Sequence, residues 1–499
     1  MVLGLYLSFP NEGEYRLNAD EGNYMNYALT LKADGFMDGM KHVAKYHADR
    51  PDKYVWPSPL RIVHLFQAWV FVNIFDGMAA LSWLSTLSYS LVVFLSFRFA
   101  KERYGPLPAL LFAVLLVTAP LGLGIARRAL MDNSNYLFVV ATVFTFLQYL
   151  KTPSYKWLAY FIVMQVLLVL EKEPSLMFLP GFALVWLVYY FKEKGKYRFT
   201  DGLIVAAAVP VLLITAYTVF LGWDNFMTIF SVMGEGIAYN QYNSYHYLYQ
   251  QGHWYRILLD YALLSPVLLL LGLVCLGYYM AKKELRQADG LIIVALFALD
   301  AMAVTFATLN LRYINYLEWI LLFMVAIVLP AIINQLVQKR KIALYAGVFA
   351  IMSIAAYNLT QFKRVFIDYD IYDPITYNLL HAADVLPDFE LDTFSKKKEL
   401  VIIDTIAPTP QDLFKIGIKK YNEGDFLGCI AANQKILELN PKSFDAWNNI
   451  CAAYNQLKEY DKAIDACNKA VALDPTNEIP QNNIEWAKMQ KATLENPAK

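Results

Sequence analysis

The sequence predicts an all-α protein: a polytopic transmembrane helical domain followed by a small helical-repeat domain. Of its 499 residues, 58% are hydrophobic and only 17% are charged, and the mean hydropathy is +0.35. A soluble chain is nearer half apolar and a quarter charged. A motif near the carboxyl end recurs after 34 residues, a period typical of helical repeats. The formal net charge is zero, which gives no support for nucleic-acid binding.

The apolar runs place the membrane domain at residues 1–358. A transmembrane helix needs about 20 predominantly apolar residues. Residues 1–9 are apolar but too short, and we interpret them as the last turns of a first span that begins upstream, ahead of a first outer loop at about 10–76. Together with that span, the runs predict eleven spans, the others lying at about 77–99, 106–124, 133–150, 157–171, 174–191, 202–222, 261–280, 290–308, 316–337 and 342–358.

The basic residues of the short loops predict the orientation. Most of them fall on one side, as at Lys192, Lys194, Lys339 and Arg340, and cytoplasmic loops carry such an excess. The first loop and the carboxyl-terminal tail are therefore expected on the outer face, periplasmic or lumenal, with a bacterial inner membrane as the predicted location. The other side carries, beyond the first loop, Arg127, Arg128, Lys172, Arg256 and Arg312.

These outer-side cations have two interpretations. A single one is usually a snorkelling anchor. Cations at the outer edge of three separate loops, Arg127-Arg128, Lys172 and Arg312 with Tyr313, favour a shared phosphate site. Arginine binds phosphate through a bidentate fork and lysine as a point charge.

Acidic residues also gather on the predicted outer face. Asp20 and Glu21 open the first loop, and Asp132 follows the Arg127-Arg128 pair. Acids close to a membrane are costly unless they meet cations or water, so they indicate a site. Alternatively, Asp20 caps a helix that begins at Glu21.

Aromatic residues mark two further outer segments. Trp56 lies in a rigid Pro-rich stretch, and the loop 239–255 combines many tyrosines with His246 and His253. An interfacial aromatic belt is one interpretation. A lid that contacts sugar or lipid is the other. The two histidines have no nearby carboxylate, so no metal site is predicted.

The tail divides into a connector at 359–409, with a short strand expected at 400–404, and a repeat domain at 410–499. Glu438-Leu-Asn-Pro441 recurs as Ala472-Leu-Asp-Pro475, and Trp447 and Tyr454 fall at tetratricopeptide spacings. Residues 478–495 are expected to cap the array. Such a module usually binds a protein or peptide; stabilising or dimerising the chain is the alternative. The four cysteines follow no disulfide or zinc spacing, so a packing role is expected.

The membrane half resembles the membrane glycosyltransferases with a GT-C fold, among them protein O-mannosyltransferases and lipid A aminoarabinose transferases. The likeness runs from the first loop to about Tyr316. No single motif is specific, and the evidence for the likeness is the order, spacing and common outer face of the motifs. The matching motifs are Asp20-Glu21-Gly22 with Tyr24, Pro57-Ser-Pro-Leu60, Arg127-Arg-Ala-Leu-Met-Asp132, Leu170-Glu-Lys-Glu-Pro174 and Arg312-Tyr313.

The resemblance implies sugar transfer from a polyprenyl-phosphate donor to an acceptor hydroxyl on the outer face, with inversion. Asp20 would be the general base, and Glu21 and Asp132 would orient the acceptor and the site. Carrier phosphate would bind Lys172, Arg312 and Tyr313, with Arg127 or Arg128. Candidate sugar or acceptor contacts are Tyr24, Trp56, His246 and His253. Phosphate leaves readily, so neither a divalent metal nor another cofactor is expected. The alternative is a non-catalytic scaffold or transporter whose repeats recruit a partner protein.

Overall fold

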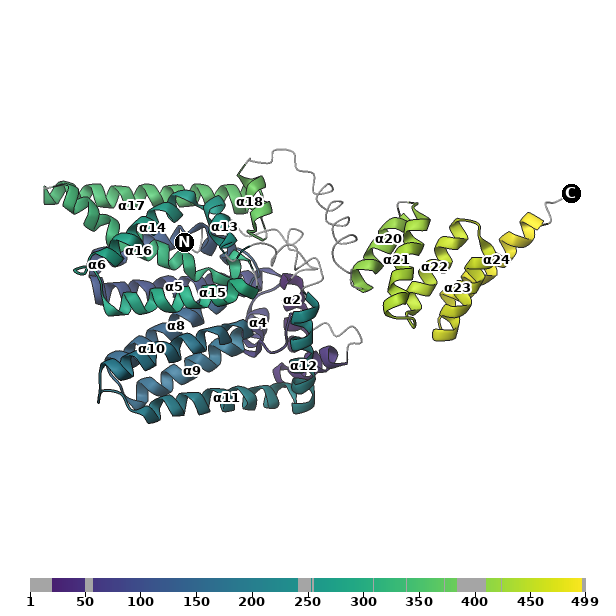
Figure 1. The fold of residues 1–499 in the computed structure, drawn as a ribbon, viewed down its shortest axis with the longest axis horizontal. Coiled ribbons are helices and arrows are strands. Elements are labelled where there is room, and N and C mark those ends of the chain that lie inside the picture. The colour runs from purple at the N-terminus through teal and green to yellow at the C-terminus, as the bar shows by residue number, and fades with distance from the viewer. Residues whose placement is uncertain are drawn as a thin grey trace. The chain divides into compact units, whose positions relative to one another are not determined.

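The computed structural model describes residues 20–49, 57–240, 253, 255–307, 309–337, 339–371, 373–383, 410–422 and 424–495. Every regular element in these ranges is a helix, as the sequence predicts. The described helices form two compact units. One holds α2 to α18 (Thr376–Ala382), apart from the end of α12 (Trp223–Asn240), and the other holds α20 to α24. Figure 1 shows both as helical assemblies. The expected first span, Trp56, His246 and the strand at 400–404 lie outside the described residues.

Among the described residues, six helices are long and apolar enough to cross a membrane. Adding the bent pair of α6 (Pro106–Val117) and α7 (Pro120–Ala126), which meet at 55°, makes seven. The six are α5 (Ala79–Tyr104), α10 (Phe178–Lys192) with its preceding turn η2 (Glu173–Met177), α11 (Phe199–Leu221), α15 (Ala288–Ala307), α16 (Tyr316–Leu336) and α17 (Arg340–Phe362) with η5 (Lys363–Asp368).

Ten of the eleven expected spans fall largely within the described residues, and these helices support seven of them. Three of the apolar runs correspond to helices that are short, broken or polar at one end. The run at 261–280 breaks at Ser265, where α13 (Arg256–Leu264) stops and Pro266 begins α14 (Pro266–Ala281). Helix α9 (Tyr155–Glu171) has 17 residues, and α8 (Asp132–Lys151) opens with four polar residues.

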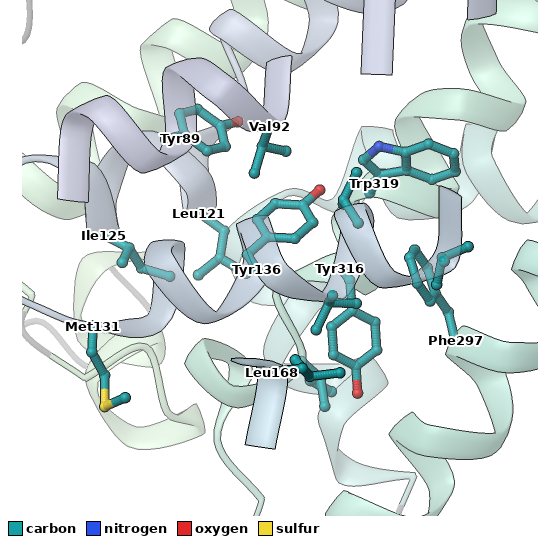
Figure 2. Packing of buried hydrophobic residues seen from close by; sticks show 14 of the residues in the cluster. Tyr89, Val92, Leu121, Ile125, Met131, Tyr136, Leu168, Phe297, Tyr316 and Trp319 are labelled. Atoms are coloured by element: carbon teal, nitrogen blue, oxygen red, sulfur yellow. The ribbon is translucent and has the colours of Figure 1, made fainter. Parts of the chain in front are cut away.

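Helix α16 is the centre of the first unit. Its side chains from Tyr316 to Val328 are largely buried, and Trp319 stacks on Phe323 with ring centroids 4.8 Å apart. Phe112 of α6 meets Trp319 edge-on at 5.0 Å. Figure 2 shows part of this packing, in which the Tyr316 ring lies beside Phe297 of α15 at 5.0 Å. Helices α5 and α8 run side by side next to this core (Figure 1).

The described part of the expected polar first loop contains three helices. These are α2 (Asp20–Asp34), α3 (Phe36–Ala48) and α4 (Ile62–Ile74). Gly35, at a φ of 79°, makes the turn between α2 and α3, in a region that glycine enters without steric cost. Helix α2 begins at Asp20, one residue earlier than the sequence suggests, so Asp20 and Glu21 both lie in its first turn. Acids there are favoured by the helix dipole.

The second unit consists of two helix pairs and a final helix. The pairs are α20 (Pro410–Asn422) with α21 (Phe426–Leu439) and α22 (Phe444–Gln456) with α23 (Tyr460–Leu473), followed by α24 (Glu478–Glu495). Gly424 and Lys458, one repeat period apart, both adopt a left-handed backbone between the helices of a pair. This match confirms the predicted repeat.

The packing role expected for all four cysteines is wrong for two of them. Cys451 of α22 and Cys467 of α23 form a disulfide, with Cα atoms 5.2 Å apart. They are 16 residues apart in sequence, and the antiparallel helices of one repeat bring them together. Cys275 and Cys429 are buried free thiols, as a packing role requires.

Candidate functional site

Charged residues from five separate segments meet at one end of the first unit. They are Asp20 at the start of α2, Asp132 at the start of α8, Lys172 between α9 and η2, Arg312 in the short helix η4 (Leu311–Ile314), and Asp373 after η5. We call these five residues the charge cluster. Four of them were singled out in the sequence, and Asp373 was not.

Asp132 is the buried centre of the charge cluster. Its Oδ1 lies 2.6 Å from Lys172 Nζ, and its Oδ2 lies 3.6 Å from Arg312 Nη1. Asn315 Nδ2 donates to the Asp132 carbonyl oxygen at 3.3 Å. A buried charge requires such partners because it has lost its hydration. Asp132 therefore holds both cations in place.

Arg312 contacts three carboxylates. Its Nε lies 2.8 Å from Asp373 Oδ1, while its Nη2 lies 3.5 Å from Asp20 Oδ2. Asn310 fixes this geometry, since its Oδ1 accepts from the Arg312 backbone N–H at 3.0 Å and its Nδ2 donates to Asp373 at 3.4 Å. Asp20 is the outermost partner, with 41% of its side chain exposed.

Tyr313 lies beneath the Lys172 ammonium. The distance from Nζ to the ring centroid is 3.9 Å, within the range of a cation–π contact. Burial lowers the pKa of Lys172 below its usual value, although Asp132 opposes this change. The charge cluster thus contains two cations and three carboxylates, so each cation is already neutralised in this structure.

A second buried group joins the first loop to the Lys172 turn. Arg61, just before α4, lies 2.7 Å from Glu173 and donates to the hydroxyl of Tyr24. Tyr24 in turn donates to Met131 Sδ at 2.9 Å. Burial raises the pKa of Tyr24 well above its usual value, so the phenol stays neutral. Arg61 was missed because it was counted only as part of the first loop, although it is a cation directly ahead of an apolar helix.

Glu21 also has a positioning contact. Its fully buried side chain accepts from the Ala129 backbone N–H at 3.2 Å and so ties α2 to the segment before Asp132. Two further glutamates, Glu171 and Glu173, stand on either side of Lys172 in the sequence. A side-chain oxygen of Glu171 lies 3.3 Å from Nδ1 of the buried His64. The glutamates on either side of Lys172 therefore face His64 and Arg61.

Arg127 and Arg128 lie against a different carboxylate. Arg128 pairs with Asp370, and Arg127 lies 3.5 Å from the same carboxylate and donates to the Phe366 carbonyl. Asp370 has a left-handed backbone with a φ of 45°. The two arginines thus anchor the segment that follows α17, whereas Lys172 and Arg312 belong to the charge cluster.

Among the remaining candidates, His253 is exposed and stacks on Tyr255 with ring centroids 5.0 Å apart. No described contact links it to the charge cluster. Within the part of the chain that the structure describes, no group of three or more His, Cys, Asp or Glu side chains is arranged to hold a metal ion.

The repeat unit has its own concave site. A groove of about 800 Å³ is bordered by α21, α22 and α23. Two aromatic rings line the groove, and a lysine ammonium lies over each of them. Lys469 Nζ lies 4.5 Å from the centroid of the Trp447 ring, and Lys462 Nζ lies 5.5 Å from that of the Tyr454 ring. Asp461 and the other lining residues make the groove mixed in charge.

Comparison with known proteins identifies the repeat. The tetratricopeptide repeat family matches residues 444–477, which cover α22 and α23. No curated protein matches the chain. The repeat is consistent with binding of a protein partner, because stacked helical repeats present such concave surfaces.

Proposed function

We propose that the protein is a GT-C-like membrane glycosyltransferase that uses a polyprenyl-phosphate sugar as its donor. The observation that carries the proposal is the charge cluster. Acidic and basic side chains from five segments meet there, and one carboxylate, Asp20, remains accessible. Inverting transfer needs this combination, since a base activates the acceptor while cations stabilise the departing phosphate.

Carrier phosphate would bind at Lys172 and Arg312. Both cations already have carboxylate partners, so an anion must replace one of them. Asp20 is the easiest to replace, because its contact with Arg312 is long at 3.5 Å and its side chain is partly exposed. Asp132 is buried and lies 2.6 Å from Lys172, and Asp373 is only 14% exposed and lies 2.8 Å from Arg312. Phosphate binding would therefore release Asp20.

The released Asp20 would act as the general base. It takes the proton from the acceptor hydroxyl while the acceptor oxygen attacks the anomeric carbon. The bond between that carbon and the phosphate oxygen breaks, and its electron pair goes to the phosphate. Lys172 and Arg312 stabilise the charge, and Tyr313 supports Lys172. Asp132 and Glu21 position these groups.

The outer face of a bacterial inner membrane is the proposed location of the charge cluster and of the repeats. The distribution of basic loop residues supports it. The Cys451–Cys467 disulfide supports it independently, because disulfides persist in oxidising compartments such as the periplasm. A protein or peptide that binds the repeats is the proposed acceptor. Deleting 410–499 should then change acceptor choice, and unchanged choice would exclude this role.

A second candidate is a non-catalytic scaffold or transporter. The neutralised state of Lys172 and Arg312 favours it, since ion pairs of this kind also hold helices together. The two candidates differ in whether the charge cluster binds an anion.

Binding of farnesyl phosphate to the full chain in lipid nanodiscs separates them. The wild type should bind, Lys172→Met should not, and Lys172→Arg should retain part of the affinity because it keeps the charge. Lys192→Met, at an exposed lysine at the end of α10, is the matched control. Wild-type failure to bind, or equal binding by Lys172→Met, would exclude the phosphate site.

A further inference from the structure

Lys172 and Tyr313 also line a small cleft. It lies between η2, α10, α15 and α16 and has a volume of about 20 Å³, enough for about one water molecule. Its other polar lining comes from Asn135, Ser175, Asp300 and Tyr316, and Ser175 Oγ donates to Asn135 Oδ1 at 2.9 Å. The cleft is therefore a polar extension beside Lys172.

Asp300 is the unusual member of this lining. It lies within the apolar helix α15, and only 2% of its surface is exposed. Tyr316 donates its hydroxyl to Oδ2, whereas Oδ1 has no hydrogen-bond partner among the described residues. A buried carboxylate oxygen without a donor is costly, and an acid at this depth marks a functional site by default.

We propose that Asp300, held by Tyr316 and joined by Asn135 and Ser175, binds hydroxyl groups of the donor sugar. The inference rests on the proposed function, because Lys172 would hold the phosphate to which that sugar is attached. A sugar hydroxyl supplies the donor that Asp300 Oδ1 lacks. A buried polar atom left without a hydrogen bond costs about 1–3 kcal/mol, so one such contact gives selectivity.

The cleft has room for about one water, so the part of the η2 turn beyond Glu173 must move outward for a sugar ring to enter. Glu173 itself stays in its ion pair with Arg61. The surroundings permit this movement. Leu176 and Met177 of η2 are exposed, and most side chains of α10 are not buried. Displacing this segment therefore breaks few apolar contacts.

The test compares bare and sugar-bearing carriers. Full-length protein in nanodiscs is titrated with farnesyl phosphate and with farnesyl-phosphoryl glucose, mannose, galactose and arabinose. The wild type should bind at least one sugar probe more tightly than farnesyl phosphate. Asp300→Asn should weaken that probe roughly ten-fold, the effect of losing one buried hydrogen bond, and leave farnesyl phosphate unchanged.

The chain offers a matched control. Tyr149 donates to Asp201 at 2.9 Å in a second buried tyrosine–aspartate pair, so Asp201→Asn makes the same chemical change elsewhere. It should keep the wild-type preference. If Asp300→Asn does not fold, Tyr316→Phe is tested in its place. Tyr316→Phe keeps the Asp300 carboxylate but removes the hydroxyl that orients it. This variant should also reduce the preference for the sugar probe.

Three results would overturn the subsite: an unchanged sugar preference in Asp300→Asn, an equal loss for bare and sugar-bearing carriers, or a wild type that prefers no sugar probe over farnesyl phosphate. In each of these the phosphate site still stands. A wild type that binds neither kind of probe refutes the proposed function, and the subsite with it.

Discussion

Replacing Asp20 by Asn tests the chemistry separately from the fold. The change keeps the size of the side chain and removes its charge and its basicity. Asp20 contributes two stabilising interactions: a 3.5 Å contact with Arg312 and a favourable position in the first turn of α2. Its side chain is 41% exposed, so solvent screens the ion pair, and both effects together should cost only about 1 kcal/mol.

The expected loss of activity is much larger. General base catalysis contributes about 10²–10⁴-fold to a rate, and Asn cannot accept the acceptor's proton. Single-turnover sugar transfer at saturating donor measures this loss, while thermal unfolding of the same preparation measures stability. Asp34→Asn is the matched control, because it removes an exposed, paired acid from the other end of α2.

Two results would refute this reasoning. Full transfer by Asp20→Asn would exclude Asp20 as the base. A stability loss several times larger than about 1 kcal/mol would mean that the Arg312 contact is worth more than an exposed pair should be, and the lost activity would then report on folding.

Three further predictions concern stability. Gly122→Ala should cost about 1–3 kcal/mol in chemical unfolding, because the added Cβ would lie 2.3 Å from the Tyr89 ring; a neutral result would mean that the ring can move. Replacing Cys451 and Cys467 together by Ser should destabilise the repeats by about 3 kcal/mol, the effect of closing a loop of this length, as measured by proteolysis of the carboxyl-terminal unit; unchanged proteolysis would contradict it. The Gly428 backbone N–H and then Lys420 lower the pKa of Asp425. The stability that Asp425 contributes by capping α21 should therefore be complete above about pH 3.9 and be lost as the pH falls through the lower folded-state pKa. Amide exchange at the start of α21 should show this loss, and Asp425→Asn should abolish the pH dependence.

The fold was predictable where its signal is periodic. The recurrence of Leu-Asn-Pro441 as Leu-Asp-Pro475 was enough to find the repeats. The spans were counted too generously because an apolar run does not show where its helix stops. Ser265 and Pro266 break one run, although the leucines on either side keep the mean hydropathy of that run high.

The site was predictable where charges violate the orientation rule. Lys172 and Arg312 stood out for this reason, and Asp132 stood out beside two arginines. Asp373 gave no such signal, since it is one of several acids in a polar stretch, and only tertiary structure brings it to Arg312. The disulfide was missed for a related reason: the spacing of Cys451 and Cys467 has meaning only once the two helices of a repeat are paired.

The contacts of Asp370 and Asp373 have a consequence for biogenesis. Both carboxylates follow the last apolar helix, yet their arginine partners belong to segments made much earlier. At roughly 5–20 residues per second, the ribosome adds Asp373 several seconds after Arg312. The delay between Arg128 and Asp370 is longer, because more residues separate them. During that interval Arg128 lacks Asp370 and Arg312 lacks Asp373, although Asp20 and Asp132 have already been made. The membrane domain can therefore reach its native charge balance only after all of its spans have been synthesised.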